Sequence, residues 1–122
     1  MSNPTVHFEV LGKDQQALTA FYTELFGWKT EEIPSASGEP YVLVEAEEGG
    51  IAGGIGQARD GIEGHVTFYV GVDDLEAALS RAESLGGKRL TEPMDIPTGQ
   101  IAHFADPEGH VIGLATSDAE GA

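Results

Sequence analysis

Two short stretches of the chain alternate between apolar and polar residues with the period of a β-strand. The first covers residues 6–10, where valine and phenylalanine alternate with His7 and Glu9. The second covers residues 65–70, where the same apolar residues alternate with His65 and two hydroxyl-bearing residues. This alternation predicts two strands, each with one apolar face and one face of polar and ionisable groups.

A helical pattern follows each of these strands. Apolar residues recur at intervals of three and four along the stretches from Asp14 to Phe26 and from Asp73 to Leu85. The aspartates at the two starts suit an N-cap, with Asp74 as the alternative for the second helix. A glycine follows each stretch and suits the left-handed residue that ends a helix. The sequence therefore predicts one helix after each strand.

Three further strands are expected after each helix, separated by turns rich in glycine and proline. Phe8 and Asp14 in the first half correspond to Phe68 and Asp73 in the second, about half the chain apart, which indicates a duplicated βαβββ unit. We therefore predict one α+β domain over residues 1–122. Its expected parts are a first unit at about 4–57, a linker at 58–64 and a second unit at about 65–116. The six further strands are expected at 28–33, 41–46, 51–57, 88–93, 100–105 and 111–116.

The charge balance limits the partners. The chain has 21 acidic residues against six lysines and arginines, a net charge of −15, which repels phosphate backbones and disfavours nucleic acid as a partner. The same field attracts cations, including metal ions and polycationic drugs. There is no cysteine, which excludes disulfides and thiolate chemistry. Short apolar runs and a start without a signal pattern predict a cytoplasmic protein with no membrane segment.

A series of short segments occurs in a characteristic order along nearly the whole chain, at 6–10, 20–22, 26–28, 53–55, 73–74, 86–87 and 106–109. Taken in this order, the segments resemble the vicinal-oxygen-chelate superfamily, which includes glyoxalases, bleomycin-resistance proteins and extradiol dioxygenases. The similarity looks greatest to the branch of lactoylglutathione-lyase-related proteins. It implies that the two units form a curved-sheet cup around a small molecule, with the helices outside.

The resemblance also implies positions for metal ligands. Members of the superfamily often hold a divalent ion through the first strand of each unit, which falls on His7 and His65 here. A third ligand, usually glutamate, comes from the last strand, and that position is Gly113. The matching positions of the first unit, 53–56, have no carboxylate either. A site for Zn, Ni, Mn or Fe would therefore be incomplete, unless His103 replaces the third ligand.

Five residues are further candidates for the site, among them His103, the possible third ligand. Glu9 shares the polar strand face with His7 and is a candidate ligand or general base. Tyr41, Tyr69 and His103 are expected to line a ligand pocket. Trp28 is a further candidate for the pocket, but it follows a helix cap and suits the core equally well. The glycines at 49–50 and 53–54 lack the context of a phosphate-binding loop and favour either a bulge or a close approach across the cup.

Two functions remain open. The first is a small-molecule-binding protein with an incomplete metal site and no assigned reaction, as in the bleomycin-resistance proteins; acidic charge suits cationic ligands and aromatic residues suit planar ones. The alternative is a metal-dependent lyase, isomerase or dioxygenase that uses His7 and His65. The missing carboxylates favour the first. Many relatives are dimers, so a homodimer is compatible with either function, whereas a domain that serves only assembly is the least favoured reading.

Overall fold

The computed structural model describes residues 2–33, 40–58, 64–96 and 99–117. Contacts between residues divide the chain into two compact units, which we call the N-terminal unit (residues 7–66) and the C-terminal unit (residues 1–6 and 67–122). Residues 34–39, between the strands expected at 28–33 and 41–46, lie outside the described residues, as do most of the predicted linker at 58–64 and residues 118–122.

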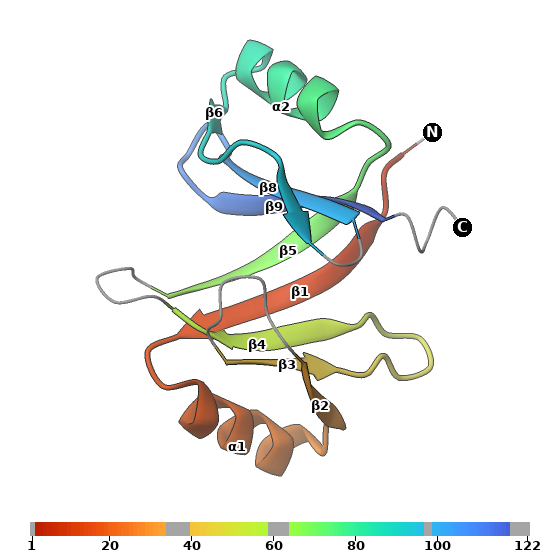
Figure 1. Ribbon diagram of the computed structural model, residues 1–122, viewed down its shortest axis with the longest axis vertical. Coiled ribbons are helices and arrows are strands. Elements are labelled where there is room, and N and C mark those ends of the chain that lie inside the picture. Colours follow the sequence, from red (N-terminus) through yellow and green to blue (C-terminus); the bar gives the residue numbers. More distant parts are fainter. Residues whose placement is uncertain (1, 34–39, 59–63, 97–98, 118–122) are drawn as a thin grey trace. The chain divides into compact units, whose positions relative to one another are not determined.

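The N-terminal unit has one helix and four strands in the order predicted from the sequence (Figure 1). The strands pair in the order β2-β3-β4-β1, in which β1 and β4 are parallel and the other pairs antiparallel. The elements are β1 (Thr5–Gly12, of which His7 onward belongs to this unit), α1 (Gln15–Phe26), β2 (Thr30–Ile33), β3 (Tyr41–Val44) and β4 (Gly53–Gln57).

Helix α1 covers one face of this sheet. It begins at Asp14, whose side chain accepts a hydrogen bond from the backbone N–H of Ala17, and it ends at Gly27, which has a left-handed φ of 71°. From the helix, Leu18 and Tyr22 pack against the buried residues of the sheet. Those buried residues are Val42, Val44 and Ile55. The apolar stripe of the helix and the apolar alternation of the strands thus form one core.

The C-terminal unit repeats this arrangement with one additional short strand. Its strands pair in the order β5-β9-β8-β6, and β7 also pairs with β8. The backbone N–H of Gly71 donates to the carbonyl of Pro4 (2.8 Å), which explains why the N-terminal segment belongs to this unit. The elements are β5 (His65–Gly71, of which Thr67 onward belongs to this unit), α2 (Leu75–Ser84), β6 (Lys88–Arg89), β7 (Met94–Ile96), β8 (Gly99–Ala105) and β9 (Val111–Ser117).

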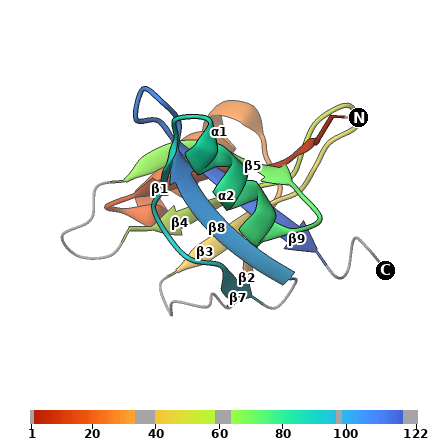
Figure 2. The same cartoon turned by 90° about the horizontal axis from the view of Figure 1, so that it is seen from above.

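Helix α2 lies over β8 and β9 (Figure 2). Its Leu75 and Leu79 are buried against Ala102 of β8 and Leu114 of β9. The side chain of Asp74 accepts a hydrogen bond from the backbone of Ala77, so Asp74, the alternative of the two predicted candidates, is the N-cap. The helix therefore covers its sheet in the same way as α1 covers the first one.

The predicted α+β class and the two βαβββ units are confirmed. Several strands are shorter than predicted: β2, for example, begins at Thr30 instead of residue 28. Strand β6 has two residues, and the rest of the stretch predicted there leads into β7. Among the described residues, no helix is long and apolar enough to cross a membrane.

In β5 the polar face is more buried than the apolar face, the reverse of what the polarity of its side chains suggests. Val66 and Phe68 on the apolar face are 74% and 41% exposed, whereas Thr67 and Tyr69 on the other face are buried. Of the apolar face, Val70 packs against the core beneath α2. The side chains on the polar face of β5 in the C-terminal unit, Thr67 and Tyr69, are therefore buried.

Candidate functional site

The candidate site lies on the face of the N-terminal sheet that α1 does not cover. Phe8 packs with the core on the helix side, and side chains alternate along a strand, so His7 and Glu9 point to the opposite face. Tyr41, at the start of β3, and His65, at the start of β5, reach the same carboxylate. All of these residues belong to the N-terminal unit.

Glu9 is the centre of a chain of hydrogen bonds, which we call the Glu9 network (His7, Glu9, Tyr41 and His65). Its Oε2 accepts from the hydroxyl of Tyr41 at 3.1 Å, and its Oε1 lies 2.9 Å from Nε2 of His65. The Tyr41 hydroxyl in turn lies 3.1 Å from Nε2 of His7. Glu9 is only 8% exposed, and a buried carboxylate needs such partners to offset the loss of its hydration.

The chemistry of these groups determines the direction of each hydrogen bond. Burial, together with the charge and hydrogen bond of Glu9, raises the pKa of Tyr41. The phenol therefore keeps its proton and donates a hydrogen bond to the carboxylate. The Tyr41 oxygen then accepts from His7, whose Nε2 must carry a hydrogen. Burial lowers the pKa of His7 more than Glu9 raises it, so this imidazole is neutral at pH 7 and its lone pair is on Nδ1.

Tyr41 can reach Glu9 because β4 has glycine where the ring crosses it. A Cβ atom at Gly54 would lie 1.9 Å from the Tyr41 hydroxyl, far inside van der Waals contact. Gly56 contacts the other edge of the same ring, where a Cβ would lie 2.6 Å from Cδ1. Of the bulge and the close approach predicted from the glycines, the structure shows a close approach at Gly54, and the group that approaches is Tyr41 of the neighbouring strand β3.

The C-terminal unit contains a second pair of a tyrosine and a histidine. The hydroxyl of Tyr69 lies 2.8 Å from Nε2 of His103, and both residues are register partners of Gly113, on β5 and β8 respectively. A Cβ atom at Gly113 would lie 2.4 Å from Cδ2 of Tyr69. The ring of Tyr69 therefore takes the space into which a side chain at residue 113 would extend.

The residues present do not fit a divalent ion. Catalytic ions usually take three protein ligands, but Tyr69 covers the predicted third position, Gly113, and Tyr41 covers Gly54, one of the matching positions of the N-terminal unit. Nε2 of His7 and of His65 are already engaged with Tyr41 and Glu9. Within the described part of the chain, no three histidine or carboxylate side chains are arranged to hold one ion.

Trp28, the remaining predicted pocket residue, lies on the other side of the sheet. Its ring is 5.3 Å from Phe8 and stacks on Tyr22 at 5.5 Å, within the core beneath α1. Large aromatic side chains gain most from such burial. Of the two interpretations that the sequence left open, the structure therefore favours the core.

Sequence reasoning missed the pairing of Glu9 with His65. The two residues are far apart in the sequence, and the alternation of each strand indicates a shared chemistry but not a shared hydrogen bond. Gly54 and Gly113 were a signal for the two tyrosine rings that lie over them, but no signal in the sequence marks the pairing of Glu9 with His65.

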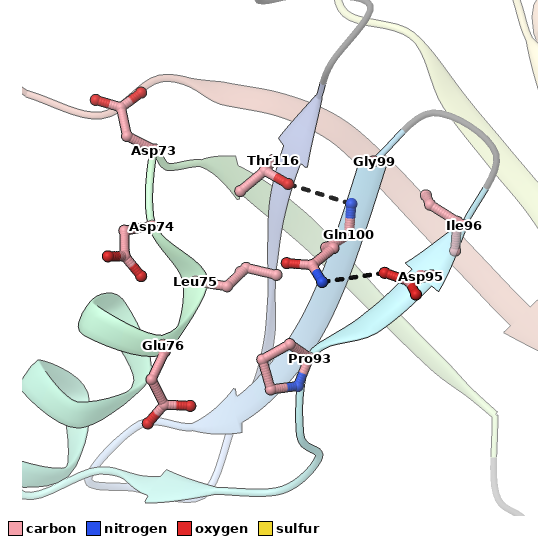
Figure 3. A pocket seen from close by; sticks show the side chains of 10 residues that line it. All are labelled: Asp73, Asp74, Leu75, Glu76, Pro93, Asp95, Ile96, Gly99, Gln100 and Thr116. Carbon is pink, nitrogen blue, oxygen red and sulfur yellow. Dashed lines mark hydrogen bonds between the residues drawn. The ribbon is translucent and has the colours of Figure 1, made fainter.

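A separate hollow of about 750 Å³ opens in the C-terminal unit, at the start of α2 (Figure 3). Its polar rim includes a hydrogen bond from the Gln100 amide to Asp95 (3.0 Å) and one from the Gln100 backbone to the hydroxyl of Thr116 (3.2 Å). It contains none of the site residues predicted from the sequence. The residues that line it are Asp73, Asp74, Leu75, Glu76, Pro93, Asp95, Ile96, Gly99, Gln100 and Thr116.

Each of the two βαβββ units places a tyrosine and a histidine on the face of its sheet away from its helix. The model of the glyoxalase/bleomycin resistance protein/dioxygenase superfamily matches residues 5–114, and the chain belongs to this superfamily. The resemblance on which the sequence predictions rested is therefore confirmed.

Individual relatives are more distant. The chain is 29% identical over 107 residues to a putative glyoxylase, CFP32, of Mycobacterium bovis, covering 87% of this chain and 41% of the relative. It is 29% identical over 117 residues to the anthracycline biosynthesis protein DnrV of Streptomyces peucetius, covering 84% and 42%. The chain thus spans less than half the length of these relatives. Methylmalonyl-CoA epimerase from Mycobacterium tuberculosis shares the fold, with a TM-score of 0.71 at 16% identity over 97% of this chain and 91% of the epimerase.

Replacing Gly54 with alanine should displace Tyr41. The new Cβ would overlap the phenol, so we expect Gly54→Ala to lower the free energy of unfolding by about 1–3 kcal/mol. In a Tyr41→Ala background the same substitution should cost nothing, because the clash is gone. Urea unfolding of the four proteins measures this coupling. Gly50→Ala, where the nearest atom is 3.4 Å away, is the control; an uncoupled Gly54→Ala would contradict this packing.

The stability of the protein should decrease below about pH 6.5 because of His7. Folding lowers the pKa of His7, so the unfolded chain takes up a proton that the folded chain resists as the pH falls below the ordinary imidazole value. We expect the free energy of unfolding of the wild type to fall more steeply between about pH 7 and pH 5 than that of His7→Gln. Chemical denaturation across this range measures both slopes, and parallel slopes would show that His7 is not buried in its neutral form.

Proposed function

We propose that the protein binds a small organic molecule on the polar face of the N-terminal sheet without a divalent ion. The observation that carries this proposal is the position of Tyr41 over Gly54, with its hydroxyl joined to both Glu9 and His7. His7 and His65, at positions where members of the superfamily often hold a metal ion, instead make hydrogen bonds with other side chains. Tyr69 and His103, paired beside Gly113, support the same interpretation in the C-terminal unit.

The chemistry of the side chains on this face and the name of one relative both support a planar organic ligand. A carboxylate, a phenol and two imidazoles provide polar contacts, and aromatic rings provide flat apolar surface. One relative is named an anthracycline biosynthesis protein, and anthracyclines are planar aromatic compounds. With a net charge of −15, the protein also favours neutral or cationic ligands over anions. Within this proposal, His7, Glu9, Tyr41 and His65 make the polar contacts.

The metal content of the purified protein tests this function. We expect untagged protein prepared without chelator to contain far less than one equivalent of Zn, Ni, Mn or Fe, and its melting temperature to stay unchanged in EDTA. Elemental analysis and thermal unfolding measure these properties. Near-stoichiometric metal that is lost in His7→Ala and His65→Ala, but kept in the exposed control His110→Ala, would contradict the proposal and favour the metal-dependent lyase, isomerase or dioxygenase alternative.

We also propose that the protein forms a homodimer through α1. Phe21, Leu25 and Phe26 of this helix are 58%, 59% and 56% exposed, and contiguous exposed apolar side chains are typical of association surfaces. Light scattering should give the mass of a dimer for the wild type and of a monomer for Phe21→Ser/Leu25→Ser. The exposed control Glu24→Ser should remain dimeric. A monomeric wild type at about 100 µM would contradict the proposal.

A further inference from the structure

We propose that the two copies of the homodimer pack their α1 helices antiparallel, so that the acidic end of each helix lies beside the N-terminal end of the other. This inference rests on the homodimer proposed above and adds the orientation of the two partners. All of the residues on which it depends lie between positions 13 and 32 and belong to the N-terminal unit.

The apolar surface of α1 lies in the C-terminal half of the helix. Phe21, Leu25 and Phe26 are each more than half exposed. The rings of Phe21 and Phe26 both contact Tyr22, at 5.1 and 6.2 Å between ring centroids, and Leu25 lies one helical turn after Phe21. The three exposed side chains therefore form one continuous patch. Because a twofold interface uses the same patch on both copies, its axis passes close to this patch.

Helix α1 also has little of the charge that makes two copies of this chain repel each other. The protein has a net charge of −15, yet the helix has a single charged residue, Glu24, among its 12. A second copy with the same negative charge meets the least repulsion where the surface is apolar and almost uncharged. The occupant that this patch suits best is therefore a second copy of the chain.

The two ends of α1 differ in charge. The N-terminal end has one basic and one acidic residue, Lys13 and Asp14. The C-terminal end, together with the start of β2, has three acidic residues and one basic residue. These are Glu24, Glu31, Glu32 and Lys29. The helix macrodipole acts in the same direction, because its negative end is the C-terminus. The C-terminal end is therefore the acidic end of the helix.

A twofold axis allows two arrangements of the paired helices. In a parallel pair each residue lies beside its own copy, so the two acidic ends coincide and Glu24 lies beside Glu24 of the second copy. In an antiparallel pair each acidic end lies beside the N-terminal end of the other helix, where the charges of Lys13 and Asp14 offset each other. Like charges that face each other across an interface weaken a complex. The charge distribution therefore favours the antiparallel pair.

Cysteine crosslinking distinguishes the two arrangements, because the chain has no cysteine of its own. Single cysteines replace Ala17, toward the start of α1, and Lys29, just past its end; both positions are exposed. In an antiparallel pair, residue 17 and its own copy are about 20 Å apart along the helix axis, at about 1.5 Å per residue. In a parallel pair only the separation of two packed helices remains, about 8–10 Å. Each variant is treated with a short bismaleimide, alone and after co-expression with the other.

We expect Ala17→Cys and Lys29→Cys to crosslink to each other in the co-expressed sample, and neither variant to crosslink to its own copy. Glu24→Cys, close to the twofold axis, should crosslink to its own copy. Glu108→Cys, at an exposed position of the C-terminal unit, gives the background from random collisions. A mass tag on one of the co-expressed copies identifies the mixed product. Thermal unfolding and light scattering before the reaction establish that each variant is folded and dimeric.

Crosslinking of Ala17→Cys to its own copy at the level of Glu24→Cys, or no mixed product between Ala17→Cys and Lys29→Cys, would overturn the antiparallel orientation. A monomeric wild type would instead overturn the proposed homodimer, and this inference with it. So would a dimer in which Glu24→Cys crosslinks no more than Glu108→Cys, because α1 would then lie outside the interface. The failure of the orientation and the failure of the homodimer are therefore distinguishable.

Discussion

Glu9 is a nearly buried carboxylate, and most of the candidate site follows from the need to satisfy it. Leaving such a group without donors would cost several kcal/mol, so each oxygen is paired, one with Tyr41 and one with His65. Tyr41 can reach Glu9 only because Gly54 leaves room for its ring. The glycines of β4 are therefore part of the site even though they have no side chains, and the tautomers of the histidines are a consequence of the same carboxylate.

The C-terminal unit has the same arrangement of tyrosine, histidine and glycine, but its tyrosine–histidine pair is described without a carboxylate. Tyr69 lies over Gly113 as Tyr41 lies over Gly54, and its hydroxyl is joined to His103. Each half of the duplicated sequence thus places a tyrosine ring over a glycine and bonds the phenol to a histidine. In a superfamily whose members often hold a metal ion, this chain has hydrogen-bonded phenols beside the expected ligand positions. These hydrogen-bonded phenols are the physical basis of the proposed binding site without an ion.

The sequence was sufficient to predict the elements but not the connections among side chains. Alternation along residues 6–10 and helical spacing after Asp14 are local signals, and both the strand and the helix formed where predicted. The same alternation placed His7 and Glu9 on one face. The pairing of Glu9 with His65, by contrast, depends on how strands distant in the sequence come together, which no local pattern specifies. Trp28 shows the related limit: an aromatic residue after a helix cap suits a pocket or a core, and only packing decides.

The central claim is that one carboxylate determines the hydrogen-bond polarity of this face, and the protonated nitrogen of each imidazole can be observed directly. Long-range ¹H–¹⁵N correlation spectra of histidine-labelled protein at about pH 8.5 distinguish the two nitrogens of every ring. The account predicts that His7 and His65 both carry hydrogen on Nε2, with an unprotonated Nδ1. Hydrogen on Nδ1 of either ring would contradict it, because the Glu9 network would then run in the opposite direction.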